Sequence, residues 1–127
     1  MSESAADMAF VRELFRGMGA VDVRRLFGLA GLYAGPVIFG LIDDGRIYLK
    51  TDAALQAELA AEGAVAWIYT QRKGPKAGVP QATSYWSLPD SAVDDPDEAC
   101  AWGRRALAAA EAIKAAGPKR RRRAQPA

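Results

Sequence analysis

The chain has 127 residues, half of them hydrophobic and a quarter charged, which fits one globular domain with a buried core. Its single cysteine, Cys100, excludes an intramolecular disulfide, and the lack of histidine removes the most common general base and metal ligand. The net charge of +2 is unevenly placed, because the run from Lys119 to Arg123 supplies 5 of the 17 cations. The remaining chain is mildly acidic.

Residues 4–18 are predicted to form an amphipathic helix. Ser4 is a candidate N-cap, and Gly17 and Gly19 favour an end to the helix. Apolar side chains recur every three or four residues and form one stripe that can face a core, namely Met8, Val11, Leu14, Phe15 and Met18.

The block from Leu26 to Ile42 carries no charge, yet it does not predict a membrane span. A spanning helix needs about 20 apolar residues, and the pair Gly35-Pro36 would break its hydrogen-bond ladder. The glycines and the pair Asp44-Gly45 are typical of tight hairpin turns. We therefore predict short strands over residues 23–27, 31–34, 37–42 and 46–50.

The strand predicted over residues 37–42 is apolar on both faces. An antiparallel strand usually has one face in contact with water. We therefore expect a helix or a partner subunit to cover the second face, and the pattern favours a homodimer formed across the sheet.

The second half of the chain predicts two helices and two strands. A helix begins at an N-cap on Thr51 or Asp52 and ends at Glu62, with Leu55 and Leu59 facing inward. Aromatic strands over residues 66–70 and 83–88 flank a loop at 71–80. The last helix starts near Pro96, runs to about residue 116, and buries a stripe of Ala99, Trp102, Ala106, Ala109 and Ile113.

Together these elements predict an α+β fold. We expect a meandering, mainly antiparallel sheet of five to six strands with an N-terminal helix, a middle helix and a long C-terminal helix. The domain is expected to span residues 1–117, and the apolar-poor segment 118–127 is expected to be a disordered basic tail.

Residues spread over these elements match the pattern of a known family: Arg24-Arg25-Leu26-Phe27-Gly28, Gly31-Leu32-Tyr33, Phe39, Asp44-Gly45-Arg46-Ile47-Tyr48-Leu49-Lys50, Asp52, Trp67-Ile68-Tyr69-Thr70, Arg72-Lys73-Gly74, Ser84-Tyr85-Trp86, Pro89, Asp95-Pro96-Asp97-Glu98 and Trp102. Over roughly residues 8–112 the chain resembles the N-terminal domain of the TfoX/Sxy family of competence regulators. It departs from the family at Leu26, Leu29 and Thr83, where the family has Met, Gly and Met.

The resemblance implies an α/β domain with a meandering antiparallel sheet and flanking helices. It also implies a regulatory role as a transcriptional co-activator that acts with the cyclic-AMP receptor protein. Full-length members carry a second, helical domain where this chain has only its basic tail. We therefore expect a stand-alone N-terminal domain.

The sequence features that resemble catalytic or ligand-binding sites are explained by structural roles. Cys100 lies early in the last helix without a base beside it, so we expect a small buried residue. Strands are predicted before and after the glycines at 28, 31 and 35, whereas a dinucleotide-binding loop needs a helix after it. The acids at 94, 95, 97 and 98 suit the N-terminus of a helix. We expect no enzymatic activity, no catalytic residue, no cofactor and no metal.

Two hypotheses for the function stay open. The first is a cytoplasmic, non-catalytic regulatory or adaptor domain that contacts a transcription factor or a polymerase component. The second is a small nucleic-acid-binding module with weak affinity, in which cations neutralise phosphates. The cations that would contact a partner or a nucleic acid are Arg24, Arg25, Arg72, Lys73, Lys76, Arg120, Arg121, Arg122 and Arg123.

Two further expectations follow from composition. Glu3 and Asp7 stand where a secretory signal would be basic, so we expect a cytoplasmic location and no membrane partner. The mild acidity of the domain disfavours a large cationic footprint on DNA or RNA. The aromatic residues Trp67, Tyr69, Tyr85 and Trp86 are expected to pack in the core or in an interface rather than to stack on bases.

Overall fold

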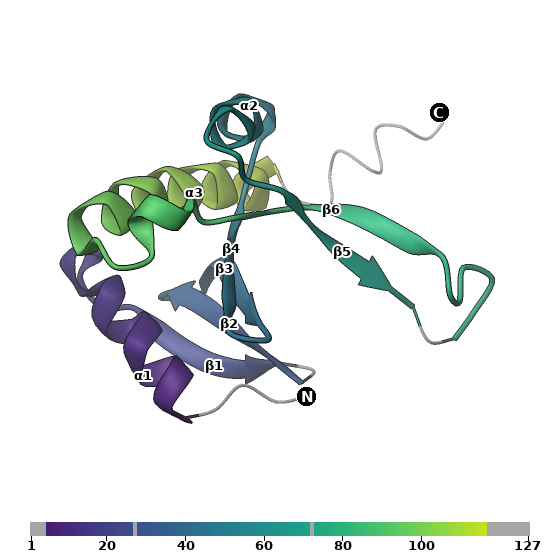
Figure 1. The fold of residues 1–127 in the computed structure, drawn as a ribbon, viewed down its shortest axis with the longest axis horizontal. Coiled ribbons are helices and arrows are strands. Elements are labelled where there is room, and N and C mark those ends of the chain that lie inside the picture. The colour runs from purple at the N-terminus through teal and green to yellow at the C-terminus, as the bar shows by residue number, and fades with distance from the viewer. Residues whose placement is uncertain (1–4, 27, 72, 117–127) are drawn as a thin grey trace.

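A computed structural model describes residues 5–26, 28–71 and 73–116, and in this part of the chain three α-helices accompany one six-stranded sheet (Figure 1). All strand pairs are antiparallel, in the order β1-β2-β3-β4-β6-β5. The predicted α+β class and sheet are confirmed. The elements are α1 (Ala5–Leu14), β1 (Asp22–Leu26), β2 (Leu29–Ala34), β3 (Val37–Asp43), β4 (Arg46–Lys50), α2 (Ala53–Ala61), β5 (Ala66–Thr70), β6 (Pro80–Ser87) and α3 (Pro96–Ala116), with 3₁₀ turns η1 (Arg16–Met18) and η2 (Asp90–Ala92).

Strands β1 to β4 form the predicted meander. Asp44 and Gly45 both have positive φ, 52° and 78°, as a two-residue hairpin turn that follows the strand twist requires. Strand β2 begins two residues before the predicted start, because Leu29 pairs with Leu26 across the first hairpin. Phe27, which was predicted to end the first strand, lies outside the described residues.

The last two strands do not follow sequence order. Strand β6 lies between β4 and β5 and pairs with both, so that β4 and β5 run parallel and α2 connects them. The connection begins as predicted, since the Asp52 carboxylate accepts a hydrogen bond from the Leu55 amide at 2.8 Å and caps α2. Leu55 and Leu59 of α2 are buried, also as predicted.

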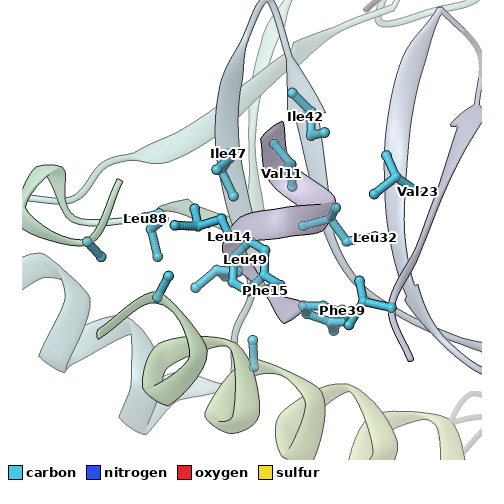
Figure 2. Close-up of a cluster of buried hydrophobic side chains, with 14 of the residues drawn as sticks. Val11, Leu14, Phe15, Val23, Leu32, Phe39, Ile42, Ile47, Leu49 and Leu88 are labelled. Atoms are coloured by element: carbon cyan, nitrogen blue, oxygen red, sulfur yellow. The ribbon is translucent and has the colours of Figure 1, made fainter. Parts of the chain in front are cut away.

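The core lies between one face of the sheet and helices α1 and α3. Figure 2 shows side chains from α1, the strands and Leu88 converging beside a helix, with Phe15 and Phe39 close together. Their ring centroids are 5.9 Å apart in an edge-to-face arrangement. The predicted apolar stripe of residues 8–18 therefore faces the core.

The first helix is shorter than the predicted range of 4–18. It ends at Leu14 and gives way to the 3₁₀ turn η1, which stops at Gly19 with φ of 99°. Gly17 lies inside this 3₁₀ turn and Gly19 ends it, so the glycines shape the turn that follows the helix. The proposed N-cap Ser4 lies outside the described residues.

Helix α3 begins where the sequence predicts. The Asp95 carboxylate accepts hydrogen bonds from the amides of Asp97 and Glu98, at 3.1 and 3.2 Å, and Pro96 occupies the first helical position. Cys100 is only 3 % exposed, which confirms the predicted buried residue. The predicted basic tail and the predicted domain end lie outside the described residues. No helix in the described ranges is both long and apolar enough to cross a membrane.

An ion pair between α2 and α3 predicts a pH-dependent contribution to stability. Two Arg105 nitrogens donate to the two Glu58 carboxylate oxygens at 2.6 Å each, and this hydrogen bonding lowers the pKa of Glu58 below 4.5. Because the folded-state pKa is depressed, the contribution is present above the unfolded pKa and is lost as the pH falls through the folded pKa. We expect Glu58→Gln to lower the thermal midpoint slightly near neutral pH.

The same experiment in acid supplies the control. Below the depressed folded-state pKa of Glu58, this side chain is protonated in both states, so the midpoints of the wild type and of Glu58→Gln should coincide. The effect is small because both side chains are largely exposed to water. A difference in midpoint that stayed the same at low pH would mean that the pair does not stabilise the fold through its charge.

Candidate functional site

A groove lies on the sheet face opposite the helical core, between β1–β3 and the β5–β6 hairpin. It has a volume of about 1030 Å³. One wall comes from the start of the sheet and the other from its last strand, because the hairpin stands away from the rest of the sheet (Figure 1). The lining residues are Leu26, Gly28, Leu29, Ile38, Leu41, Asp43, Trp67, Ile68, Tyr69, Thr70, Gln71, Lys73, Thr83 and Tyr85.

Trp67 of β5 ties the two walls of the groove together. Its indole N–H donates to the Asp43 carboxylate at 2.9 Å, a charge-assisted bond between β5 and β3. Its ring centroid lies 6.4 Å from Tyr48, 5.7 Å from Tyr69 and 6.4 Å from Tyr85. This aromatic cluster fixes the hairpin against the sheet and gives the groove a preformed shape.

The groove explains the strand that is apolar on both faces. Phe39 and Ile42 of β3 are buried in the core, whereas Ile38 and Leu41 line the groove. The expected cover for this second face was a helix or a partner subunit. In the described part of the chain, the β5–β6 hairpin of the same molecule covers this face, and Trp67 of β5 forms a hydrogen bond with Asp43 of β3.

Burial shifts the pKa values of two side chains, Tyr85 in the aromatic cluster and Lys50 next to it. Lys50 of β4 donates to the Ser84 hydroxyl at 2.7 Å and lies 5.0 Å from the Tyr85 ring centroid. Burial lowers the pKa of Lys50, and burial followed by the neighbouring Tyr33 raises the pKa of Tyr85. Tyr85 therefore keeps its phenolic proton, a hydrogen-bond donor, above the pH at which a free tyrosine would lose it.

The cations that the sequence predicted as contact residues do not lie together in the described part of the structure. Lys73 lines the groove, and Lys76 is exposed in the loop beyond it. Arg24 lies 4.6 Å from the Tyr33 ring centroid and pairs with Asp22 at 3.1 Å. Arg25, its neighbour in β1, points to the opposite face of the sheet. The other predicted contacts, Arg72, Arg120, Arg121, Arg122 and Arg123, lie outside the described residues.

The sequence did not predict the apolar wall of the groove or the carboxylate that holds Trp67 in place. Leu26, Leu29 and Ile38 form this wall, and Asp43 holds the tryptophan. The uncharged block was a signal that these residues pack against something. Nothing local in the sequence pairs Asp43 with Trp67, because 24 positions separate them.

Comparison with known proteins places the chain in a family. No curated protein sequence matches it. The family model of the TfoX N-terminal domain matches residues 13–110, a range that contains all six strands, α2 and most of α3. This match covers most of the chain and agrees with the residues on which the resemblance rested. The chain therefore belongs to the TfoX N-terminal domain family.

Proposed function

We propose that the chain is a cytoplasmic, non-catalytic regulatory adaptor domain, and that the groove receives a segment of a protein partner. The observation that carries this proposal is the groove of about 1030 Å³ on the sheet face opposite the helices. Membership of the TfoX N-terminal domain family supports a regulator-like role in general. The partner that we propose is a transcription factor or a polymerase component.

The chemistry of the groove suits a protein segment. Its walls are apolar and aromatic at Leu29, Ile38 and Trp67, and its rim is polar at Thr70, Gln71 and Lys73. An apolar centre with a polar rim is the common anatomy of protein interfaces, which are enriched in Tyr and Trp. The bond from Trp67 to Asp43 holds the aromatic wall in place, which lowers the entropic cost of binding.

A charge placed on the apolar wall tests the proposal. We expect Leu29→Glu to weaken partner retention by roughly tenfold or more, because an unpaired charge desolvated in an interface costs well over about 1.4 kcal/mol. The measurement is quantitative affinity capture from the native lysate, with and without nuclease treatment. Phe10→Glu is the matched control, since Phe10 is 50 % exposed on α1 and does not line the groove.

The thermal midpoint of each variant checks that both remain folded. The proposal predicts that the wild type and Phe10→Glu retain the same protein, which folded Leu29→Glu loses. Equal retention by all three chains would mean that the groove does not contact the partner. Loss of all bound protein on nuclease treatment would instead favour a nucleic-acid bridge.

One observation favours single-stranded nucleic acid as a second candidate. Lys73 lines the same groove as Trp67 and Tyr69, and a groove that combines a cation with aromatic rings is the usual arrangement for holding phosphates and bases. Lys73→Ala should then weaken retention of a single-stranded oligonucleotide at low salt and reduce its salt dependence, whereas Lys76→Ala in the outer loop should have less effect. A wild-type protein that retains no oligonucleotide at low salt would rule this candidate out.

A further inference from the structure

The two edges of the sheet differ in charge. Edge strand β1 carries Asp22, Arg24 and Arg25 within five residues. Edge strand β5 carries no charge, and the uncharged stretch extends from Gly63 to Gln71. Charged side chains on an edge strand discourage pairing with another chain, and an uncharged apolar edge promotes it. The edge of β5 is therefore the one suited to receive a further strand.

The outer side of β5 presents regularly spaced main-chain groups. The amide of Val65 donates to the Ser87 hydroxyl, and its carbonyl accepts from the Ser87 amide, so the main chain of Val65 faces β6. Because successive residues of a strand turn their main-chain groups to opposite sides, the groups of Ala66, Ile68 and Thr70 face outward. In the described chain β6 is the strand with which β5 pairs.

The irregularity in this hairpin leaves β5 itself regular. Ala66 pairs with Trp86, and Ile68 pairs with Ala82, so three residues of β6 lie opposite Trp67 alone. The extra residues thus belong to β6, and β5 can accept a partner along its whole length. Figure 1 shows the far end of the hairpin extending away from the helices. Ile68 at the centre of β5 is 52 % exposed, although it is a large apolar residue.

We propose that β5 pairs antiparallel with β5 of a second copy of this chain, about a two-fold axis at Ile68. In this register Ile68 lies opposite its own copy, and Ala66 lies opposite Thr70 on both sides of the axis. All three residues with outward main-chain groups then form hydrogen-bonded pairs. Trp67 of one chain lies opposite Tyr69 of the other, an aromatic pair of the kind that stabilises cross-strand contacts.

The charges at the two ends of β5 favour this orientation and a second copy as the occupant. In the sequence, Glu62 precedes the uncharged stretch, and Arg72 and Lys73 follow it. Antiparallel pairing turns the basic end of one chain toward the acidic end of the other, whereas parallel pairing would bring like charges together. The edge is therefore complementary to itself.

Cysteine cross-linking tests the register. In a hydrogen-bonded antiparallel pair the two Cα atoms are about 5.5 Å apart, within disulfide range. Ile68→Cys chains equilibrated with oxidised glutathione should therefore form a disulfide-linked dimer, with glutathione reduced in exchange. Thr70→Cys chains should stay unlinked, because their Cα atoms would be roughly 14 Å apart. The single native thiol, Cys100, is buried and does not compete.

Mixing two single variants gives a positive control for the register. Ala66→Cys chains mixed with Thr70→Cys chains should form a linked heterodimer, because these positions face each other across the axis. Sedimentation of the wild type should show a concentration-dependent species of twice the 13.6 kDa chain mass. The association should be weak, because two five-residue strands bury less than the roughly 1,200–2,000 Å² of a standard interface.

Ile68→Pro tests the same pairing without a thiol. Proline is tolerated on an edge strand where the amide faces outward, so this variant should keep the fold and sediment as a monomer. Two results would overturn the proposal. One is a wild type that sediments as a monomer at every concentration. The other is equal cross-linking of the Ile68→Cys and Thr70→Cys chains, which would indicate random collisions. Because Ile68 and Thr70 also line the groove, both tests use the purified chain alone, where no groove partner is present.

Discussion

Replacement of Phe39 by alanine is expected to lower the free energy of unfolding by about 3–5 kcal/mol. Phe39 is fully buried, and its ring packs edge-to-face on Phe15 at 5.9 Å. It is also the unpaired residue of a bulge in β3, because Leu32 pairs with Gly40 while Tyr33 pairs with Ile38. The substitution would lose the transfer free energy of the buried ring and its contact with Phe15. It would also leave a cavity between the sheet and the helices.

Chemical denaturation at equilibrium measures this change. Phe10→Ala is the matched control, because the same side chain is removed from a half-exposed position on α1. We expect this control to stay within about 0.5 kcal/mol of the wild type, as exposed substitutions usually do. Equal losses for the two variants would contradict the assignment of Phe39 to the core.

Replacement of Gly40 by alanine is expected to cost about 1–3 kcal/mol, although only a methyl group is added. A Cβ atom at Gly40 would lie 2.8 Å from the carbonyl oxygen of Tyr48 and 2.9 Å from a methyl carbon of Leu32. The oxygen belongs to the neighbouring strand β4, so it cannot move without shifting the strand pair. The expected result is a lower denaturation midpoint with an unchanged denaturant dependence.

An addition of methyl groups at an exposed strand position provides the comparison for Gly40→Ala. Ala82 of β6 is exposed, and Ala82→Val places a β-branched residue where strands favour one. We expect the free energy of unfolding of this control to stay close to that of the wild type. If Gly40→Ala were as stable as the wild type, β3 and β4 would not approach each other at Gly40 as closely as described.

Local signals in the sequence predicted the fold wherever the chemistry of neighbouring residues decides the structure. The pair Asp44-Gly45 predicted a hairpin turn because positive φ is needed there. Asp52 predicted the start of α2 because its side chain caps the helix within three residues. The burial of Cys100 was expected because a free cysteine with no base beside it is usually a small core residue. Each of these inferences depends on residues that are adjacent along the chain.

Features that depend on distant residues escaped prediction. The insertion of β6 between β4 and β5 is set by tertiary packing and has no local signal. Pro80 was assigned to a loop, yet it begins β6, because proline is tolerated at the first position of a strand. The groove joins the β1–β3 part of the sheet to the β5–β6 hairpin, so only the folded sheet brings its walls together.

The central claim, that the groove contacts a protein, is tested most directly by cross-linking in the cells that make this chain. A photoreactive phenylalanine analogue replaces either Tyr69 in the groove, 45 % exposed, or Phe10 on α1. The account predicts a discrete, nuclease-resistant adduct with a protein other than this chain from position 69 and none from position 10. An adduct with only a second copy of this chain, an adduct that nuclease removes, or equal adducts from both positions would contradict it.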